Sequence, residues 1–372
     1  MVMGNSATCS KWAQLEQLCP SFVMKLKILQ LAPLYKPLTP GIGYGSIERI
    51  VIGLDSGFTK AGFDSYVCAL NGSKISGTLL ESLGINNYET QAEIALDFLK
   101  KRDVDIVHIH RRNFLQTRAF EFCKTKNINI PVLYTLHGLA KDLIKKFDFS
   151  INIFDLDNLF FNAVSRYQAK NLSNLFPIKE VVHNGVDIAL YNYVDNQTRD
   201  YFLSIGRLNR EKGTHIAIQF AKKTKIPLII AGNIVDKDYF ESDIRPYIDN
   251  ENVKFLGELT DQEKIPLFQH AIAVLMMGEY NDPCPLVAIE ALSCGTPVIA
   301  FKRGGIPEIV QDGITGLLLD SLDDGLKKIT GLAKINNEEC RKRIEQEFSL
   351  NQMAEKYFVL YSKLIEKMKR GI

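Results

Sequence analysis

The stretch SIGRLNREKGTHIAI, residues 204–218, has the order of a strand, a glycine-containing turn and the start of a helix. Its β-rich part ends at Arg207 and helical spacing of apolar residues begins near Thr214, which is typical of a parallel β-α unit. Lys212 lies at the start of that helix, near Arg207. A helix N-terminus carries about half a positive charge, so Arg207, Arg210 and Lys212 are unfavourably placed there unless an anion such as a phosphate is bound. The alternative is a solvated basic turn that Glu211 partly neutralises.

The same alternation of strand-like and helical segments fills the chain on both sides of this stretch. It occurs twice, and the polar, non-periodic segment YNYVDNQTRD at 191–200 separates the two halves. The sequence therefore predicts an α/β fold with two Rossmann-like, doubly wound domains, at 25–190 and 201–345, joined by a linker at 191–200. The predicted strands are 25–33, 64–70, 104–110, 132–137, 159–165 and 180–186 in the first domain and 201–208, 227–232, 253–259, 271–277, 297–301 and 315–320 in the second.

Three further segments have distinct patterns. Residues 46–58 have helical spacing of apolar residues, with Ser46 as the expected N-cap. Residues 346–372 carry one apolar stripe, which predicts a long amphipathic helix that must cover a surface. Residues 1–24 lack the continuous apolar stretch of a signal peptide, and we expect them to be a disordered extension.

Composition and charge narrow the class of protein. Hydrophobic residues make up 46% of the chain, and 45 Lys and Arg face 43 Asp and Glu. A dedicated nucleic-acid binder needs a strong basic excess, so nucleic acid is not expected as a partner. Apolar runs stay below the ~18 residues that cross a bilayer.

The cysteines are few and do not occur in closely spaced pairs. There are 7 of them, and none forms a CxxC motif. A disulfide framework or zinc site needs clustered thiols, so we expect free thiols in a reducing compartment, the cytoplasm.

A second segment that indicates a ligand is NDPCPLVAIEALSCGTPVIA, residues 281–300. Pro285 suits the first turn of a helix, and Glu290 lies in that helix with apolar neighbours on every side. A buried carboxylate costs several kcal/mol unless it has partners. Ribose hydroxyls of a ligand would provide them, and so would a structural ion pair with a core Arg or Lys. Asp282, in the preceding turn, either binds a ligand or caps the helix.

The loop LYKPLTPGIGYGSIERI, residues 34–50, brings glycines to the start of the predicted helix at Ser46. Glycine lets a backbone approach a ligand closely, and the helix end favours negative charge. A nicotinamide-binding fingerprint does not fit, because the loop is too long and the strand ending at Leu70 lacks the expected acid.

The histidines differ in their expected roles. His137 follows a predicted parallel strand at its carboxyl end, where open α/β sheets bind ligands; a hydrogen-bonded core histidine is the alternative. His108 and His110 share one strand face without a carboxylate partner, so no metal site is expected.

The second half of the chain resembles the retaining GT-B glycosyltransferases of family 4. SIGRLNREKG resembles that family's phosphate-binding turn, and DPCPLVAIEALSCGTPVIA resembles its Glu-x7-Glu segment. In the first half, LAPLYKPLTPGIGYGSIERI resembles the family's "APLY…P…YGGTER" opening. The likeness runs from about Leu26 to the C-terminus. It implies a GT-B fold, with two Rossmann-like domains facing a central cleft and the C-terminal helix crossing back to the N-terminal domain.

The resemblance also implies roles for individual residues. Those expected to take part in catalysis are His137, Arg207, Lys212 and Asp282. Those expected to bind the donor are Gly45, Ser46, Arg207 and Lys212 at the diphosphate, Glu290 at the ribose, and His137, Asp282, Cys284, Pro285 and Leu286 at the sugar.

This sequence departs from the family pattern at three of these positions. Asp282 is one methylene shorter than the usual Glu, Pro285 replaces a Gly and lacks an N–H, and Ser46 replaces the second Gly of the loop. These departures leave the identity of the sugar open.

The function that the resemblance implies is transfer of a hexose from a UDP- or GDP-sugar to a glycan or lipid-linked acceptor. Retention of anomeric configuration, independence of metal and of any cofactor, and a place in polysaccharide biosynthesis are implied with it. Two alternatives are a catalytically silent GT-B protein that binds a nucleotide sugar, and a GT-B sugar-nucleotide epimerase.

A basic and apolar segment with Lys141, Lys145 and Lys146 favours weak peripheral membrane contact. A solvated face is the alternative.

Overall fold

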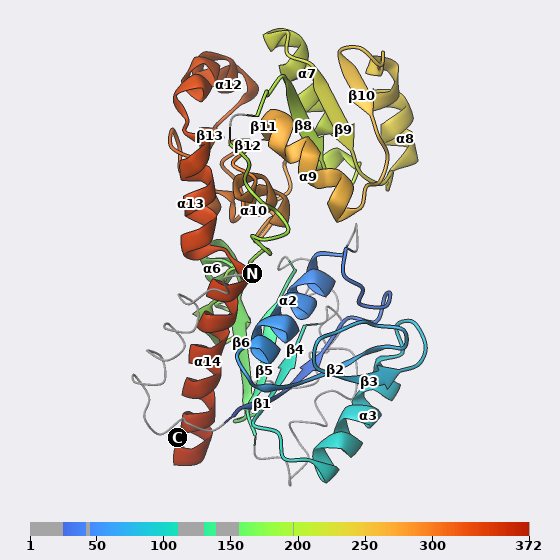
Figure 1. The fold of residues 1–372 in the computed structure, drawn as a ribbon, viewed down its shortest axis with the longest axis vertical. Coiled ribbons are helices and arrows are strands. Elements are labelled where there is room, and N and C mark those ends of the chain that lie inside the picture. The colour runs from blue at the N-terminus through green and yellow to red at the C-terminus, as the bar shows by residue number, and fades with distance from the viewer. Residues whose placement is uncertain (1–24, 42–44, 111–129, 139–155, 196, 372) are drawn as a thin grey trace, which may run out of the picture.

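The computed structural model describes residues 25–41, 45–110, 130–138, 156–195 and 197–371. They form two α/β domains, one above the other, each built on a parallel sheet (Figure 1). The predicted fold class, two Rossmann-like domains with helices, is confirmed.

The N-terminal domain has a sheet in the order β3-β2-β1-β4-β5-β6-β7 with parallel pairing between neighbours. Three of its strands, β4, β5 and β6, are buried along their whole length, because helices cover both faces of a parallel sheet. Its strands are β1 (Lys27–Leu31), β2 (Asp64–Leu70), β3 (Thr78–Ser82), β4 (Ile106–Ile109), β5 (Val132–Leu136), β6 (Leu159–Ala163) and β7 (Ile178–Val181), and its described helices are α2 (Ser46–Lys60), α3 (Tyr88–Lys101) and α6 (Arg166–Leu172).

The C-terminal domain repeats this topology, with a sheet in the order β10-β9-β8-β11-β12-β13. Its strands are β8 (Tyr201–Ile205), β9 (Leu228–Ala231), β10 (Val253–Phe255), β11 (Ala271–Met276), β12 (Val298–Phe301) and β13 (Gly316–Leu319). Its helices include α7 (Thr214–Thr224), α8 (Lys237–Tyr239), α9 (Asp261–His270), α10 (Leu286–Ser293), α11 (Ile306–Ile309), α12 (Leu322–Lys328) and α13 (Asn337–Glu347). In both sheets the strand order reverses next to the first strand of the domain, and such a switch point is where ligands bind in open α/β sheets.

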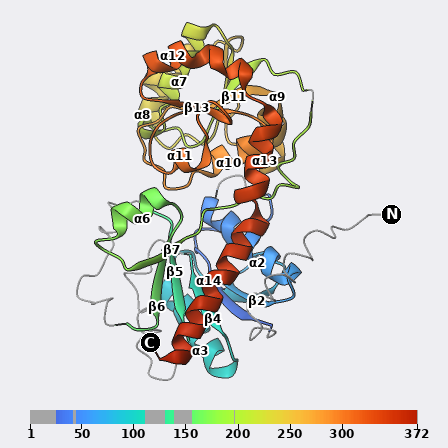
Figure 2. The same ribbon diagram turned by 90° about the vertical axis from the view of Figure 1, so that its left-hand side faces the viewer.

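The last helix, α14 (Leu350–Arg370), crosses from the C-terminal domain and lies along the N-terminal domain beside α2 (Figure 2). The two helices approach closely at glycines of α2, since a Cβ on Gly53 would clash with the Leu350 side chain. The ring of Phe358 stacks on Phe63 with centroids 5.3 Å apart. One buried apolar cluster includes Phe58 of α2, Tyr361 of α14 and residues of the C-terminal domain, so the two domains share a core.

Local differences from the sequence predictions have physical reasons. The strand β3 was not predicted, because it is an edge strand with one fully buried residue and no apolar run. The expected cap Ser46 is instead the first residue of α2, and the N-cap is Gly45, whose φ of 145° strongly favours glycine. Likewise Pro285 is the N-cap of α10 rather than a residue of its first turn.

The segment between the two sheets is not uniformly exposed. Tyr191, the first residue of the predicted linker, is 2% exposed and its hydroxyl donates to Asp261 at 2.9 Å.

Within the described residues, no helix is both long enough and apolar enough to cross a membrane.

Candidate active site

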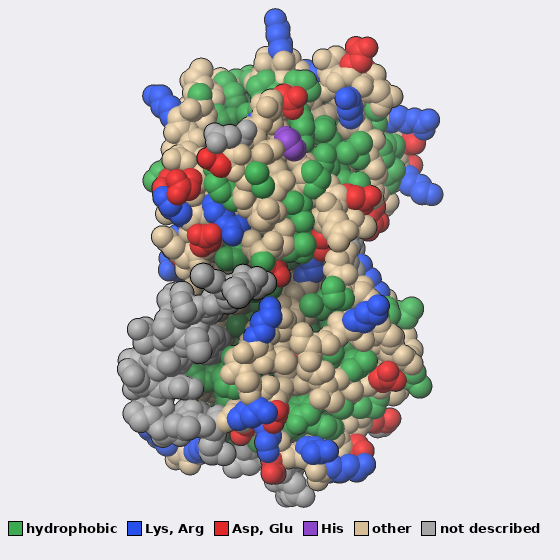
Figure 3. Space-filling model, viewed as in Figure 1, with side chains coloured by type: hydrophobic (Ala, Val, Ile, Leu, Met, Phe, Trp, Pro, Cys, Tyr) green, Lys and Arg blue, Asp and Glu red, His purple; other side chains and the backbone are tan. Residues whose placement is uncertain are grey.

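A cavity lies where the two domains meet, at the narrow waist of the molecule (Figure 3). Every site residue expected from the sequence lines it, although these residues come from both domains and lie far apart in the chain. The lining includes Gly45, Ser46, His137, Arg207, Lys212, Asp282, Cys284, Pro285, Leu286 and Glu290.

The basic turn after β8 is held by its backbone. It contains a 3-10 turn, Arg210–Lys212, followed by Gly213 in the left-handed region with φ of 71°. A Cβ on Gly213 would clash with the carbonyl oxygen of Met277, and one on Gly278 would clash with that of Glu211. The turn therefore packs against the end of β11, which places Lys212 at the carboxyl ends of β8 and β11.

Lys212 and Asp282, both expected in the site, contact each other. The Lys212 ammonium donates to Asp282 Oδ2 at 2.9 Å and lies 4.6 Å from the centroid of the Tyr280 ring. Each side chain of the pair is 24% exposed, so both remain accessible to a ligand. An anion that binds here would share the ammonium with Asp282.

The segment from Asp282 to Leu286 is shaped by backbone packing. The amide of Gly305 donates to the carbonyl of Asp282 at 2.8 Å, and a Cβ on Gly305 would clash with the carbonyl of Pro283. Burial raises the pKa of the Cys284 thiol, which keeps it neutral at pH 7 and unsuited to nucleophilic attack. Cys284 therefore contributes shape rather than a thiolate.

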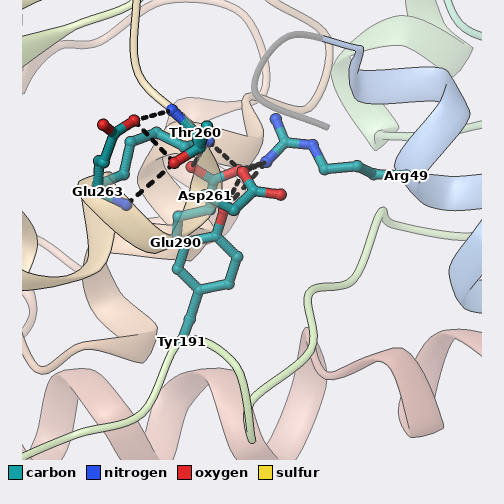
Figure 4. Close-up of polar contacts among 7 residues, drawn as sticks. Arg49, Tyr191, Thr260, Asp261, Glu263 and Glu290 are labelled. Atoms are coloured by element: carbon teal, nitrogen blue, oxygen red, sulfur yellow. Dashed lines mark hydrogen bonds and ion pairs between the residues drawn. The ribbon is translucent and has the colours of Figure 1, made fainter. Parts of the chain in front are cut away.

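Glu290 is buried, as its apolar surroundings in the sequence indicate, and the structure supplies it with a cation from the other domain. Its Oε1 lies 2.5 Å from Nη1 of Arg49, which also lies 3.2 Å from Asp261 Oδ1. Lys264 binds Asp261 Oδ1 at 2.5 Å and lies 3.7 Å from Glu290 Oε2. Tyr191 completes this set, which we call the charged cluster: Arg49, Tyr191, Asp261, Lys264 and Glu290 (Figure 4).

The start of α9 fixes two members of the charged cluster. Thr260 and Glu263 form a reciprocal capping box, in which the Glu263 carboxylate accepts from the Thr260 amide at 2.8 Å. This cap places Asp261 and Lys264 on the first turn of the helix, beside Glu290.

His137 is half-buried and lines the cavity, with a second histidine behind it. Its Nε2 lies 3.3 Å from Nδ1 of His110. Burial, and secondarily the other histidines, hold the pKa values of His108 and His110 well below their usual range, so both rings are neutral at pH 7. Among the residues that the structure describes, no group of three or more His, Cys, Asp or Glu side chains could hold a metal ion.

Comparison with known proteins gives the family. The model of the Glycosyltransferase Family 4 matches residues 47–190, and the model of the Glycosyl transferases group 1 matches residues 192–369. The chain belongs to the group 1 glycosyltransferases. Its assignment as a glycosyltransferase enzyme of this family, predicted from the motifs, is thereby confirmed.

Individual members of the family match most of the chain. An uncharacterized glycosyltransferase of Methanocaldococcus jannaschii is 29% identical over 300 residues, which are 77% of this chain and 82% of that protein. The O-antigen chain mannosyltransferase C of Escherichia coli is 24% identical, over 92% of this chain and 99% of that enzyme. The crystal structure of Anabaena HepE in complex with UDP-glucose has the same fold, with a TM-score of 0.69 at 18% identity over 91% of this chain and 100% of that one.

In this glycosyltransferase Glu308 connects the two domains outside the cavity. Its carboxylate accepts from the amides of Arg166 and Tyr167 at the start of α6, each at 2.8 Å, and lies 2.8 Å from Nε2 of His183. Burial alone would raise the pKa of Glu308, but the hydrogen bonds from His183, Tyr167 and Arg166 outweigh it and lower the pKa below 4.5. The ionised carboxylate is therefore the form that joins the domains.

Replacing Glu308 by glutamine is expected to lower the free energy of unfolding at pH 7 by about 1–2 kcal/mol, because two charge-assisted bonds to a helix N-terminus are weakened. A lowered pKa in the folded state gives stability that is present above the unfolded value and lost as the pH falls through the folded one. The difference between the wild type and Glu308→Gln should thus shrink below about pH 4.5. Urea denaturation from pH 3 to 7 tests this, with the exposed Glu93→Gln as control; a pH-independent difference would contradict it.

Proposed function

We propose that this glycosyltransferase transfers a hexose from a UDP- or GDP-sugar to a glycan or lipid-linked acceptor, with retention of anomeric configuration and without a metal ion. The observation that carries the proposal is the convergence of the expected donor-binding residues on one cavity between the domains. Two cations, Arg207 and Lys212, line that cavity at the switch point of the second sheet, where an open α/β sheet binds its ligand.

The donor would lie along the cavity in an order set by these residues. Arg207 and Lys212 would hold the diphosphate, with Gly45 and Ser46 facing it from the other domain. Glu290 would bind the ribose. The sugar would lie against His137 and the segment from Asp282 to Leu286. A bound UDP-glucose in the structure of HepE supports a nucleotide sugar as the donor of this fold.

Charge development explains how the site would act. When the bond from the anomeric carbon to the diphosphate breaks, its electron pair stays with the leaving phosphate oxygen and the sugar becomes positive. Fixed cations at the leaving group stabilise that transition state more than the ground state. The acceptor oxygen then forms the new bond on the same face, and its proton passes to the leaving phosphate. Because Arg207 and Lys212 supply positive charge, the step needs no metal.

The acceptor would bind on the N-terminal domain side of the cavity. The O-antigen chain mannosyltransferase C of Escherichia coli, which aligns along nearly its whole length, supports a growing glycan as the acceptor. We propose that the enzyme acts in the cytoplasm. Peripheral membrane contact through Lys141, Lys145 and Lys146 stays a prediction, because these residues lie outside the described part of the chain.

Thermal stability against a panel of nucleotides and nucleotide sugars tests the proposal. A ligand that binds only the folded state at 100 times its Kd stabilises it by about 2.7 kcal/mol. We expect UDP or GDP to raise the Tm of the wild type and of the exposed control Lys254→Ala, but not of Lys212→Ala or Glu290→Ala. If no nucleotide shifts the Tm, the donor site is absent and the proposal fails.

The product separates transfer from the two alternatives. A nucleotide sugar that binds but is neither hydrolysed nor transferred would favour a catalytically silent binding protein. NMR of the donor incubated without acceptor would show an isomerised sugar if the protein were an epimerase. Glycosylation of an added acceptor supports transfer.

A further inference from the structure

Arg49 of α2 reaches across the cavity to the Glu290 carboxylate of α10. Its Nη1 lies 2.5 Å from Glu290 Oε1 and 3.2 Å from Asp261 Oδ1. Figure 4 shows the side chain extending from α2 into the charged cluster of the other domain. The Glu290 side chain is 1% exposed and that of Arg49 is 20% exposed. The ion pair is therefore shielded from water, yet Arg49 and Glu290 both line the cavity.

The second oxygen of Glu290 is buried and has no hydrogen-bond partner among the described residues. The Lys264 ammonium of the cluster lies 3.7 Å from this Oε2 and is bound at 2.5 Å to Asp261 instead. Leaving a buried acceptor unpaired is unfavourable, and more so when the acceptor is charged. Oε2 is thus an acceptor that a hydroxyl group of a ligand would satisfy.

We propose that Arg49 is a positioning residue for ribose recognition. By binding Oε1 of Glu290 from the N-terminal domain, it keeps Oε2 available to accept a hydroxyl of the nucleotide ribose. The inference rests on the proposed function and extends it, because residues of both domains would then form the ribose site.

Charge balance in the cluster explains why Arg49 is needed. Arg49 and Lys264 together neutralise Asp261 and Glu290, and such interactions are strong where water is excluded. Without Arg49 the two carboxylates would face Lys264 alone. The ammonium would then move between them and occupy Oε2, and the ribose would lose its acceptor.

The test compares ribonucleotides with their deoxy analogues. Calorimetry would give the Kd of UDP, GDP and ADP and of the 2′-deoxy and 3′-deoxy forms of whichever binds most tightly. A hydrogen bond to a charged group is worth about 1.5–3 kcal/mol, so the wild type should prefer the ribonucleotide by about tenfold or more. We expect this preference to fall to about twofold in Arg49→Met and in Glu290→Gln, and to be partly restored in Arg49→Lys.

The ratio of the Kd of the deoxynucleotide to that of the ribonucleotide distinguishes a positioning role of Arg49 from a general structural effect. A variant that merely loosened the domain contact would weaken ribonucleotides and deoxynucleotides alike and leave their ratio unchanged. The control Arg245→Met removes an exposed arginine paired with Glu241 and should keep the wild-type ratio. If Arg49→Met keeps that ratio while Glu290→Gln loses it, this inference is wrong and the proposed function stands. If the wild type binds none of the nucleotides, both are wrong.

Discussion

Replacing Lys212 by alanine is expected to lower kcat by about two to three orders of magnitude while the chain stays folded. The ammonium lies in the cavity at the end of a turn that is fixed by backbone contacts, so it is preorganised for the charge that develops on the leaving diphosphate. Removing it also leaves Asp282 without the cation that it binds at 2.9 Å. The unpaired carboxylate would then repel the phosphates and add to the loss.

A double variant separates these two effects. Lys212→Ala with Asp282→Asn removes the repulsion as well, and we expect it to bind UDP or GDP more tightly than Lys212→Ala does without regaining kcat. Initial rates with the nucleotide sugar that the stability panel identifies provide the measurement, and Lys254→Ala is the exposed control. A kcat for Lys212→Ala within about threefold of the wild type would show that Lys212 does not stabilise the leaving group.

The order of strands and helices could be predicted from the sequence because it depends on local patterns of apolar residues. Apolar runs such as 64–70 and 271–277 correspond to strands, β2 and β11, that are buried in parallel sheets. An edge strand carries no such signal, and β3 was missed for that reason. The caps at Gly45 and Pro285 depend on backbone angles that residue type alone does not determine.

The cavity-lining residues could be assigned from motifs, but the partners of Glu290 could not. The sequence shows that this carboxylate needs a partner and leaves a ribose and a core cation as alternatives. Arg49 lies 241 positions away on the other domain, so its contact depends on how the domains meet. Asp261 lies within a recognisable capping-box sequence, Thr260 to Glu263, and Lys264 directly follows it. That sequence could have indicated the start of α9, although not the charged cluster beside it.

A second set of long-range polar contacts holds α14 on the sheet of the N-terminal domain. At its centre is the Thr135 hydroxyl of β5, which donates to Asn162 Oδ1 at 2.7 Å and lies 2.6 Å from His108 Nε2 and 3.1 Å from the Tyr357 hydroxyl. Since the hydroxyl proton goes to Asn162, His108 Nε2 and Tyr357 must donate to Thr135. His108 Nδ1 then accepts from the Tyr361 hydroxyl at 2.5 Å. Every hydrogen bond of the network then has one donor and one acceptor. This assignment needs a neutral His108, and burial lowers its pKa accordingly.

Thr135→Val should therefore lower the free energy of unfolding by about 3–5 kcal/mol, because one substitution leaves the buried His108 Nε2 and Asn162 Oδ1 without a partner and removes the acceptor of the Tyr357 hydroxyl. Urea denaturation measures this loss. Thr78→Val on the exposed edge strand β3 is the control and should stay within about 0.5 kcal/mol of the wild type.

Comparing the free energies of unfolding of Thr135→Val and Thr135→Ser shows whether the hydroxyl or the shape of Thr135 matters. Valine keeps the shape and loses the hydroxyl, whereas serine keeps the hydroxyl and loses one methyl group, which costs about 0.5–1.5 kcal/mol in a core. If the polar network holds α14 in place, Thr135→Val must be the less stable variant. The reverse order would mean that packing alone positions the helix. In that case His108, Asn162 and Tyr357 would have to find other partners when the hydroxyl is removed, which their burial in a close-packed interior opposes.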